Sequence, residues 1–248
     1  MVYQIFESIV NYVKGTIHST FSMTPYKDKI EKPLYLVIEH TTFFLGGYLT
    51  FWNRDWLYDL SMMWDYSFEW SVYIYYYLYF IRYIVQIKHM ERNYKDYKIL
   101  LTHHIMTMML LVISCFRFTR IGVIIALSHG ISDIFLNFAK IMSKIYESTN
   151  DKRHNMLSNV LLSFFAVSWT PTRIILNYNI LSEIYTHKNM SINVFMYDCW
   201  IDEKIAVLLL MINFSLQVFW QILIIKFVYN IFIGSPPEDE NGVKYKVV

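Results

Sequence analysis

Six apolar runs, each close to the length that crosses a lipid bilayer, constrain this chain more than any other feature. They cover residues 34–51, 68–87, 99–117, 121–140, 157–180 and 205–230. A transmembrane helix needs about 20 mainly apolar residues. Hydrocarbon offers backbone groups no water, so such runs form helices that satisfy their own hydrogen bonds. The sequence therefore predicts an all-α fold, a polytopic membrane helical bundle of about six transmembrane helices.

The composition supports a membrane protein and excludes one class of partner. Hydrophobic residues make up 55% and charged residues 17% of the 248 residues, whereas soluble domains carry about 25% charged residues. The formal net charge of +2 is too small to indicate a nucleic-acid partner. The two cysteines, Cys115 and Cys199, give neither a disulfide framework nor the spacing of metal ligands. We expect one membrane domain without a separate soluble domain.

Three segments follow from the positions of the apolar runs. Residues 34–230 form the predicted membrane domain, after a cytosolic or interfacial segment at 1–33 and before a cytosolic tail at 231–248. In the first segment, apolar residues recur at helical spacing, at Ile5, Phe6, Ile9, Val10 and Val13. This spacing predicts an amphipathic helix in the membrane interface, with a disordered tail as the alternative.

Basic residues set the predicted orientation in the membrane. Lysine and arginine gather in residues 1–33 and in the connections at 88–98 and 140–153. Cytosolic connections carry the excess of Lys and Arg, so we expect these segments and both termini in the cytosol. The ending Lys244–Val248 has the Lys-x-Lys-x-x form of a retrieval signal, and Asn189–Ser191 is a glycosylation sequon in the predicted lumenal loop. Together they favour a multi-pass protein of the endoplasmic reticulum membrane.

Polar side chains interrupt the third and fourth runs at one predicted depth. His103 and His104 lie just inside the third run, and His129, Ser132 and Asp133 lie in the fourth. At about 1.5 Å per residue, both sets come out about 6–10 Å below the cytosolic boundary. A charged group at the bilayer centre costs roughly 2.5–3.5 kcal/mol, so such residues usually face the bundle interior and carry function. The sequence thus predicts a polar layer in a cavity that opens to the cytosol.

Other runs add polar residues near this level, and some have purely structural interpretations. The additional residues are Glu39, His40, Arg82 and Gln221. Intramembrane histidines can simply bond neighbouring helices, and Arg82 can extend to the lipid head groups. Pro171 predicts a kink rather than a site. Gly122, Ala126 and Gly130 recur every four residues, a pattern that favours close packing of helices.

Around the histidines, the sequence is similar to a known motif. Its elements, in chain order, are Glu91-Arg92-x-x-Lys95-Asp96, His103-His104, Ser114, Arg120-Ile121-Gly122, His129-x-x-Ser132-Asp133, Leu136-x-x-Ala139-Lys140 and Tyr146. This pattern resembles the Lag motif of ceramide synthases, within the TLC (TRAM–LAG1–CLN8) family of membrane proteins. The likeness covers about residues 32–230. One departure is Gly130, where ceramide-forming members usually carry an aspartate.

The resemblance implies a reaction, substrates and site residues. Family members move a fatty acyl group from acyl-CoA, the co-substrate, to the amine of a sphingoid base, which forms ceramide. The resemblance implies a TLC-type fold in the lipid bilayer with no cofactor and no bound metal, and it leaves a homo- or heterodimer open. The catalytic residues expected from it are His103, His104, His129 and Asp133. Those expected to bind substrate are Arg82, Lys95, Ser132 and Lys140.

The residue types suit this chemistry on physical grounds. An imidazole can accept the proton of the attacking amine, or attack the thioester itself to give an acyl-imidazole. Asp133 can orient a histidine and stabilise its cationic form. His103 is expected to be the nucleophile or base, with His104 and His129 as proton-transfer partners, although the sequence leaves the division of roles open. The alternative function is a TLC-family protein that binds or transfers lipid, or assists translocation, without catalysis. Gly130 favours that alternative, and the paired histidines oppose it.

Overall fold

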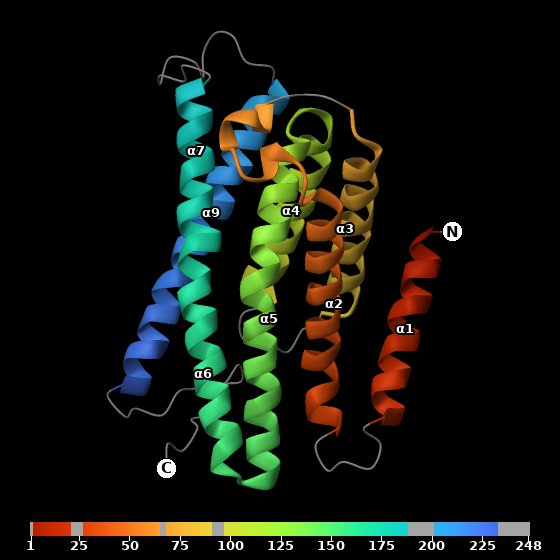
Figure 1. Ribbon diagram of the computed structural model, residues 1–248, viewed down its shortest axis with the longest axis vertical. Coiled ribbons are helices and arrows are strands. Elements are labelled where there is room, and N and C mark those ends of the chain that lie inside the picture. The colour runs from red at the N-terminus through yellow and green to blue at the C-terminus, as the bar shows by residue number, and fades with distance from the viewer. Residues whose placement is uncertain (1, 21–26, 65–67, 91–96, 188–200, 233–248) are drawn as a thin grey trace. The chain divides into compact units, whose positions relative to one another are not determined.

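A computed structural model describes residues 2–20, 27–64, 68–90, 97–187 and 201–232 (Figure 1). All regular structure in these ranges is helical, so the predicted all-α class is confirmed. The chain divides into two compact units. The first unit comprises Met1–Arg54 and Ile124–Thr172, and the second comprises Asp55–Val123 and Arg173–Val248.

In the first unit, an N-terminal helix packs antiparallel against the next helix. The Lys14 ammonium lies 4.9 Å from the ring centroid of Tyr35, and His18 Nδ1 lies 3.3 Å from Glu31 Oε2. Burial lowers the pKa of Lys14, an effect opposed by the carboxylate of Glu31. The amphipathic helix expected within residues 1–33 is therefore present; its place in the membrane interface stays a prediction. The helices of the first unit are α1 (Val2–Thr20), α2 (Lys27–Phe51), the part of α5 (Thr119–Thr149) from Ile124 onward, and α6 (Lys152–Trp169).

Helix α2 packs antiparallel against α5. Ile30 and Val37 of α2 and Ile141 of α5 form a buried apolar cluster. Nearer the other end of α2, a Cβ placed on Gly130 would lie 3.9 Å from the backbone oxygen of His40. A side chain at Gly130 would therefore make only ordinary contact with α2, and the close packing expected from the small-residue pattern stays a prediction at this position.

A tight turn reverses the chain between α5 and α6. Asn150 adopts a left-handed backbone conformation with φ of 53°, which ends α5. Asp151 then caps α6, because its side chain accepts a hydrogen bond of 2.9 Å from the Arg153 N–H. Further along, the Ser158 hydroxyl donates to the Ala139 carbonyl at 2.9 Å. This bond connects the two helices where no water competes for the carbonyl.

In the second unit, α4 is the central helix and packs against both α3 and α9. The Tyr76 hydroxyl of α3 lies 3.1 Å from the Ser114 hydroxyl of α4. A Cβ on Gly122, just past the turn at Phe118, would overlap the Tyr76 hydroxyl. Glycine is therefore required there by a close approach. The elements of this unit are η1 (Asp55–Leu57), η2 (Leu60–Trp64), α3 (Trp70–Lys88), α4 (Tyr97–Arg117), the start of α5, the end of the π-helical turn η3 (Thr170–Ile175), α7 (Leu176–His187) and α9 (Ile201–Phe232).

A buried arginine holds the short helices η1 and η2 against the start of α3. Arg120 Nη1 donates to the Met62 carbonyl at 2.9 Å, and its Nη2 lies 3.5 Å from Glu69 Oε1. The Trp56 indole N–H donates to the same carboxylate oxygen at 3.3 Å. Arg120 is only 6% exposed, so its charge is compensated by these contacts rather than by water.

Four helical stretches in the described residues are long and apolar enough to cross a membrane: Tyr97–Cys115, Thr119–Thr149, Lys152–Thr186 and Lys204–Asn230. They match the third to sixth predicted runs. Helices α2 and α3 correspond to the first two runs but fall outside this set. Glu39 and His40 lower the hydropathy of α2, and Arg82 with several tyrosines lowers that of α3. The number of spans stays a prediction. Pro171, where a kink is expected, lies in the π-helical turn η3, and the kink itself stays a prediction.

The close approach at Gly122 yields a stability test. Gly122→Ala should lower the thermal midpoint in detergent by a few degrees, since overpacking costs about 1–3 kcal/mol, while alanine gains about 1 kcal/mol in helix propensity. Gly130→Ala in the same helix is the matched control. Its Cβ would meet only Phe44 Cβ at 3.5 Å and the His40 carbonyl, which is ordinary contact. Equal midpoints for the two variants would contradict the packing described at Tyr76.

Candidate functional site

The paired histidines lie on α4 in the second unit and are contacted by aromatic rings from two neighbouring helices. The ring centroids of His103 and His104 are 5.7 Å apart. Tyr83 of α3 meets His104 edge-on at 5.1 Å, and Trp220 of α9 meets His103 edge-on at 5.0 Å. His103 is buried and His104 is half-buried. Both imidazoles are therefore oriented by aromatic rings inside a helix that is apolar enough to cross a membrane.

Arg82 lies one residue before Tyr83 on α3 and is 3% exposed. Its guanidinium carbon lies 5.0 Å from the ring centroid of Tyr79, a distance at which a cation is attracted to an aromatic face. The tyrosines themselves stack along α3, with Tyr79 and Tyr83 ring centroids 5.5 Å apart. The guanidinium is thus buried within the unit, and the alternative of extension to the lipid head groups is not observed.

In the first unit, the other predicted site residues lie along α5. His129 and Ser132 are buried and Asp133 is half-buried. The Ser132 hydroxyl donates to the His129 carbonyl at 3.3 Å, and the Asn137 amide donates to the Asp133 carbonyl at 2.8 Å. These bonds use backbone oxygens. The imidazole and carboxylate at i and i+4 share one face of the helix, as the spacing predicts.

Helix α2 brings two more titratable residues to the level of His129 and Asp133. The backbone of His40 approaches α5 at Gly130, which lies between those two residues. Glu39 and His40 are 6% and 8% exposed. The Tyr35 hydroxyl donates to Glu39 Oε1 at 3.4 Å. Within the first unit, α2 and α5 therefore bring polar residues close together, while the polar layer expected across several helices stays a prediction.

Seven of the eight predicted site residues fall into two groups, one in each unit, and the eighth lies outside the described residues. The second unit holds His103, His104 and Arg82, and the first holds His129, Ser132, Asp133 and a half-buried Lys140. Lys95 lies outside the described residues, as do the sequon and the C-terminal dilysine sequence. The encounter of the histidine pair with Asp133 stays a prediction.

Sequence reasoning missed the aromatic side chains that contact the histidines. Neither Tyr83 nor Trp220 is among the site residues expected from the sequence. A useful signal was the helical spacing of Tyr75, Tyr79 and Tyr83, which places three rings on one buried face of α3. No sequence pattern indicates that Trp220 reaches His103, because the two residues lie far apart in the chain.

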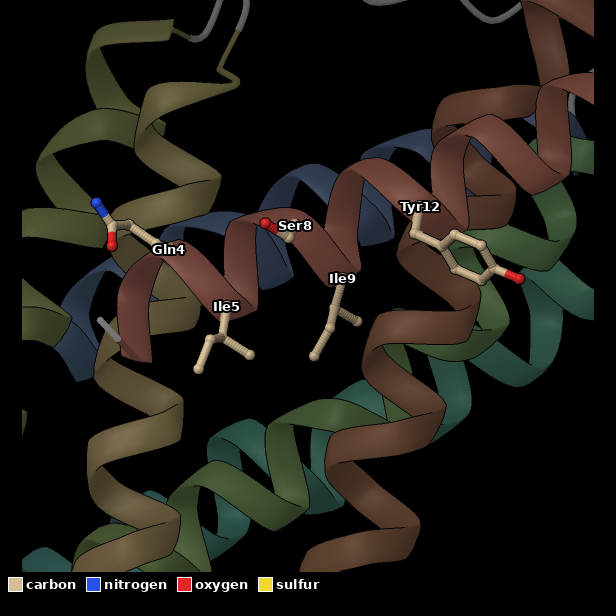
Figure 2. A pocket seen from close by; sticks show the side chains of 5 residues that line it. All are labelled: Gln4, Ile5, Ser8, Ile9 and Tyr12. Carbon is tan, nitrogen blue, oxygen red and sulfur yellow. The ribbon is translucent and has the colours of Figure 1, made fainter.

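A shallow hollow of about 410 Å³ lies on α1 of the first unit, whereas His103 and His104 belong to the second unit (Figure 2). Its lining residues all come from this one helix: Gln4, Ile5, Ser8, Ile9 and Tyr12. Ile5 and Ile9 are 52% and 54% exposed. The lining contains no histidine, acid or lysine, so this hollow offers no acid–base chemistry.

The edge-on contact of Trp220 with His103 can be tested by chemical labelling. Trp220→Ala should raise the rate at which diethyl pyrocarbonate modifies His103 several-fold, because it removes the ring that covers the imidazole. Mass spectrometry of the labelled peptides measures this rate, with the partly exposed His154 as internal reference. Phe219→Ala, at an exposed neighbouring position on α9, is the control and should change nothing. An unchanged labelling rate in Trp220→Ala would argue against the contact.

Known proteins match most of this chain. The TLC domain (TRAM–LAG1–CLN8) family matches residues 29–226. Sphingosine N-acyltransferase lac1 of Schizosaccharomyces pombe is 28% identical over 167 residues, 64% of this chain and 41% of that protein. Ceramide synthase hyl-1 of Caenorhabditis elegans is 28% identical over 214 residues, 81% of this chain and 56% of that protein. Ceramide synthase LOH2 of Arabidopsis thaliana is 32% identical over 109 residues, 42% of this chain and 34% of that protein.

The chain spans about half, or less, of the length of these relatives. The family match, by contrast, covers most of the chain and includes every predicted catalytic residue. The chain belongs to the TLC domain family.

Proposed function

We propose that this chain is an N-acyltransferase that moves a fatty acyl group from acyl-CoA to the amine of a sphingoid base. The observation that carries the proposal is the pair of a buried His103 and a half-buried His104 on a helix apolar enough to cross a membrane. A bilayer-embedded imidazole can meet two substrates that are themselves mostly hydrocarbon. The names of the relatives, sphingosine N-acyltransferase and ceramide synthase, support the same reaction.

The reaction needs an unprotonated amine, a base and a good leaving group. The amine nitrogen attacks the thioester carbonyl, a C–N bond forms and the C–S bond breaks. His103 accepts the proton that the amine loses, and the coenzyme A thiolate leaves and takes up a proton. In the covalent variant, the His103 imidazole attacks the thioester first, and the amine then resolves the acyl-imidazole. Both routes end in an amide and free coenzyme A, so atoms and charges balance.

Neighbouring residues support these steps. Tyr83 and Trp220 keep the imidazoles in a low-dielectric setting, where a charged intermediate interacts strongly with any carboxylate. Asp133 is the proposed partner that orients a histidine and stabilises its cation, with His129 and His104 in proton transfer. Arg82, Lys95 and Lys140 are the proposed contacts for the phosphates of coenzyme A, and Ser132 for a polar group of the substrate.

The proposed location is the endoplasmic reticulum membrane with both termini in the cytosol. The distribution of Lys and Arg supports this orientation. In it, His103 lies six residues after Tyr97, about 9 Å along the helix from the cytosolic end of α4. Acyl-CoA would then approach from the cytosol while both hydrocarbon chains stay within the bilayer.

Replacement of the proposed catalytic residues tests the function. His103→Ala and Asp133→Ala should each lower acyl transfer at least about 100-fold, since a general base or nucleophile contributes about 10²–10⁴-fold. The assay uses membranes without their own ceramide-forming activity, labelled sphinganine and a series of acyl-CoA chain lengths, with product detected by mass spectrometry. His154→Ala and Asp59→Ala are the controls, because both residues lie at partly or fully exposed positions outside the site.

The outcomes separate the residue assignment from the function itself. Near-normal turnover in both variants would contradict the assignment of His103 and Asp133. No ceramide from the unaltered chain with any acyl-CoA, despite correct folding by size-exclusion chromatography, would favour a TLC-family protein that binds or transfers lipid. This second function is considered because Gly130 stands where ceramide-forming members usually carry an aspartate.

A further inference from the structure

A second group of buried polar residues lies on α7 and α9, apart from the histidines. Arg173 precedes α7 by three residues and is 4% exposed, and Asn177 one turn later is 0% exposed. Asn213 and Gln217, one turn apart on α9, are 3% and 0% exposed. None of these four residues takes part in the chemistry described above. Burial of such polar groups in hydrocarbon is costly, so residues of this kind usually carry a function.

The two helices bring these residues together in a definite register. Arg173 Nη1 donates to Gln217 Oε1 at 3.4 Å, and the Asn177 side-chain amide donates to the Arg173 carbonyl at 2.6 Å. Helices α7 and α9 pack against each other and run in opposite directions (Figure 1). With Arg173 opposite Gln217, one turn forward on α7 and one turn back on α9 place Asn177 at the level of Asn213. The four residues therefore form one polar cluster between two helices.

The cluster lies deep in the predicted membrane. Gln217 is thirteen residues from Lys204 and thirteen from Asn230, the ends of the apolar stretch of α9. At about 1.5 Å per residue, this is about 20 Å from either end, close to the middle of a hydrocarbon core about 30 Å thick. Helix η3, which supplies Arg173, is a π-helical turn, an irregularity that occurs frequently at functional sites.

The two residues of the cluster on α9 each have one polar atom with no hydrogen-bond partner among the described residues. One is Oδ1 of Asn213, an acceptor, and the other is Nε2 of Gln217, a donor. Leaving a buried donor or acceptor unsatisfied costs about 1–3 kcal/mol each. A hydroxyl group carries one donor hydrogen and acceptor lone pairs, so a single hydroxyl can satisfy both atoms. An acyl chain or a hydrocarbon tail offers neither.

The cluster shares a helix face with the contact to His103. Asn213, Gln217 and Trp220 are spaced by four and then three residues along α9, which places them on one face. Trp220 at the end of this row meets the His103 ring. Gln217 lies about 4.5 Å along the helix axis from Trp220, and Asn213 about 10 Å. The two polar atoms of Asn213 and Gln217 therefore lie on the same face of α9 as the ring that contacts His103.

We propose that Asn213 and Gln217, with Arg173 holding Gln217 in place, form a subsite for a hydroxyl group of the amine substrate. This inference rests on the proposed function, since a sphingoid base carries its hydroxyl groups on the carbons next to the amine carbon. A hydroxyl bound at Asn213 and Gln217 positions the amine toward His103. The subsite makes the enzyme selective for hydroxylated long-chain amines over plain ones.

The experiment compares sphinganine with dideoxysphinganine, which has the same chain and amine but lacks both hydroxyl groups. In acyl transfer, Asn213→Leu and Gln217→Met should lower kcat/KM for sphinganine about tenfold, since one lost hydrogen bond is worth about 1 kcal/mol or slightly more. Both variants should leave kcat/KM for dideoxysphinganine within about twofold. Ser215→Ala, on the exposed face of the same helix, is the matched control and should change neither value. An equal loss with both bases would indicate a structural role and overturn the proposal.

A binding measurement tests the subsite even if acyl transfer fails. Sphinganine should raise the thermal midpoint of the purified full chain in detergent more than dideoxysphinganine does, and Asn213→Leu should abolish that difference. Asn213→Leu leaves the bond between Arg173 and Gln217 intact, so it is the variant that should keep the fold. A hydroxyl-dependent shift without turnover would support the subsite and contradict the proposed reaction. Turnover without any preference for the hydroxylated base would support the reaction and overturn the subsite.

Discussion

A polar side chain within these apolar helices is costly to bury unless a polar partner lies on its own or a neighbouring helix, because hydrocarbon supplies none. The contacts between helices follow from this constraint. In the second unit, the Tyr76 hydroxyl meets Ser114 and reaches the Phe118 carbonyl. In the first unit, the Ser158 hydroxyl bonds the Ala139 carbonyl. Such bonds fix which faces of the helices pack together, and the small residues beside them allow the close approach.

The same constraint separates groups that hold the fold from groups that can do chemistry. Arg120 is compensated by Glu69, by a backbone carbonyl and by the indole that shares that carboxylate; its polar atoms are used to hold loops. The imidazoles of His103 and His104 are instead contacted by aromatic rings. Such ring contacts restrict the orientation of an imidazole. This arrangement suits a residue that must accept a proton or an acyl group.

Hydropathy and spacing predicted the helices well, and contacts between distant helices poorly. The third to sixth apolar runs became helices α4, α5, the α6–α7 stretch and α9 because length and apolar content suffice to determine a membrane helix. The i, i+4 spacing of His129 and Asp133 likewise predicted a shared face. In contrast, the burial of Arg82 and the ring contact of Trp220 with His103 depend on which faces meet. A single sequence does not encode that choice in any local pattern.

The position of Arg173 also bears on how the chain enters the membrane during synthesis. An arginine near the middle of a helix costs about 2.5–3.5 kcal/mol on translocon-insertion scales. Its hydrogen-bond acceptor, Gln217, belongs to α9, which emerges from the ribosome later. The hydrogen bond to Gln217 can therefore offset that cost only after α9 has been made. Truncation before α9 consequently also affects the earlier helix, because it removes a hydrogen-bond acceptor of Arg173.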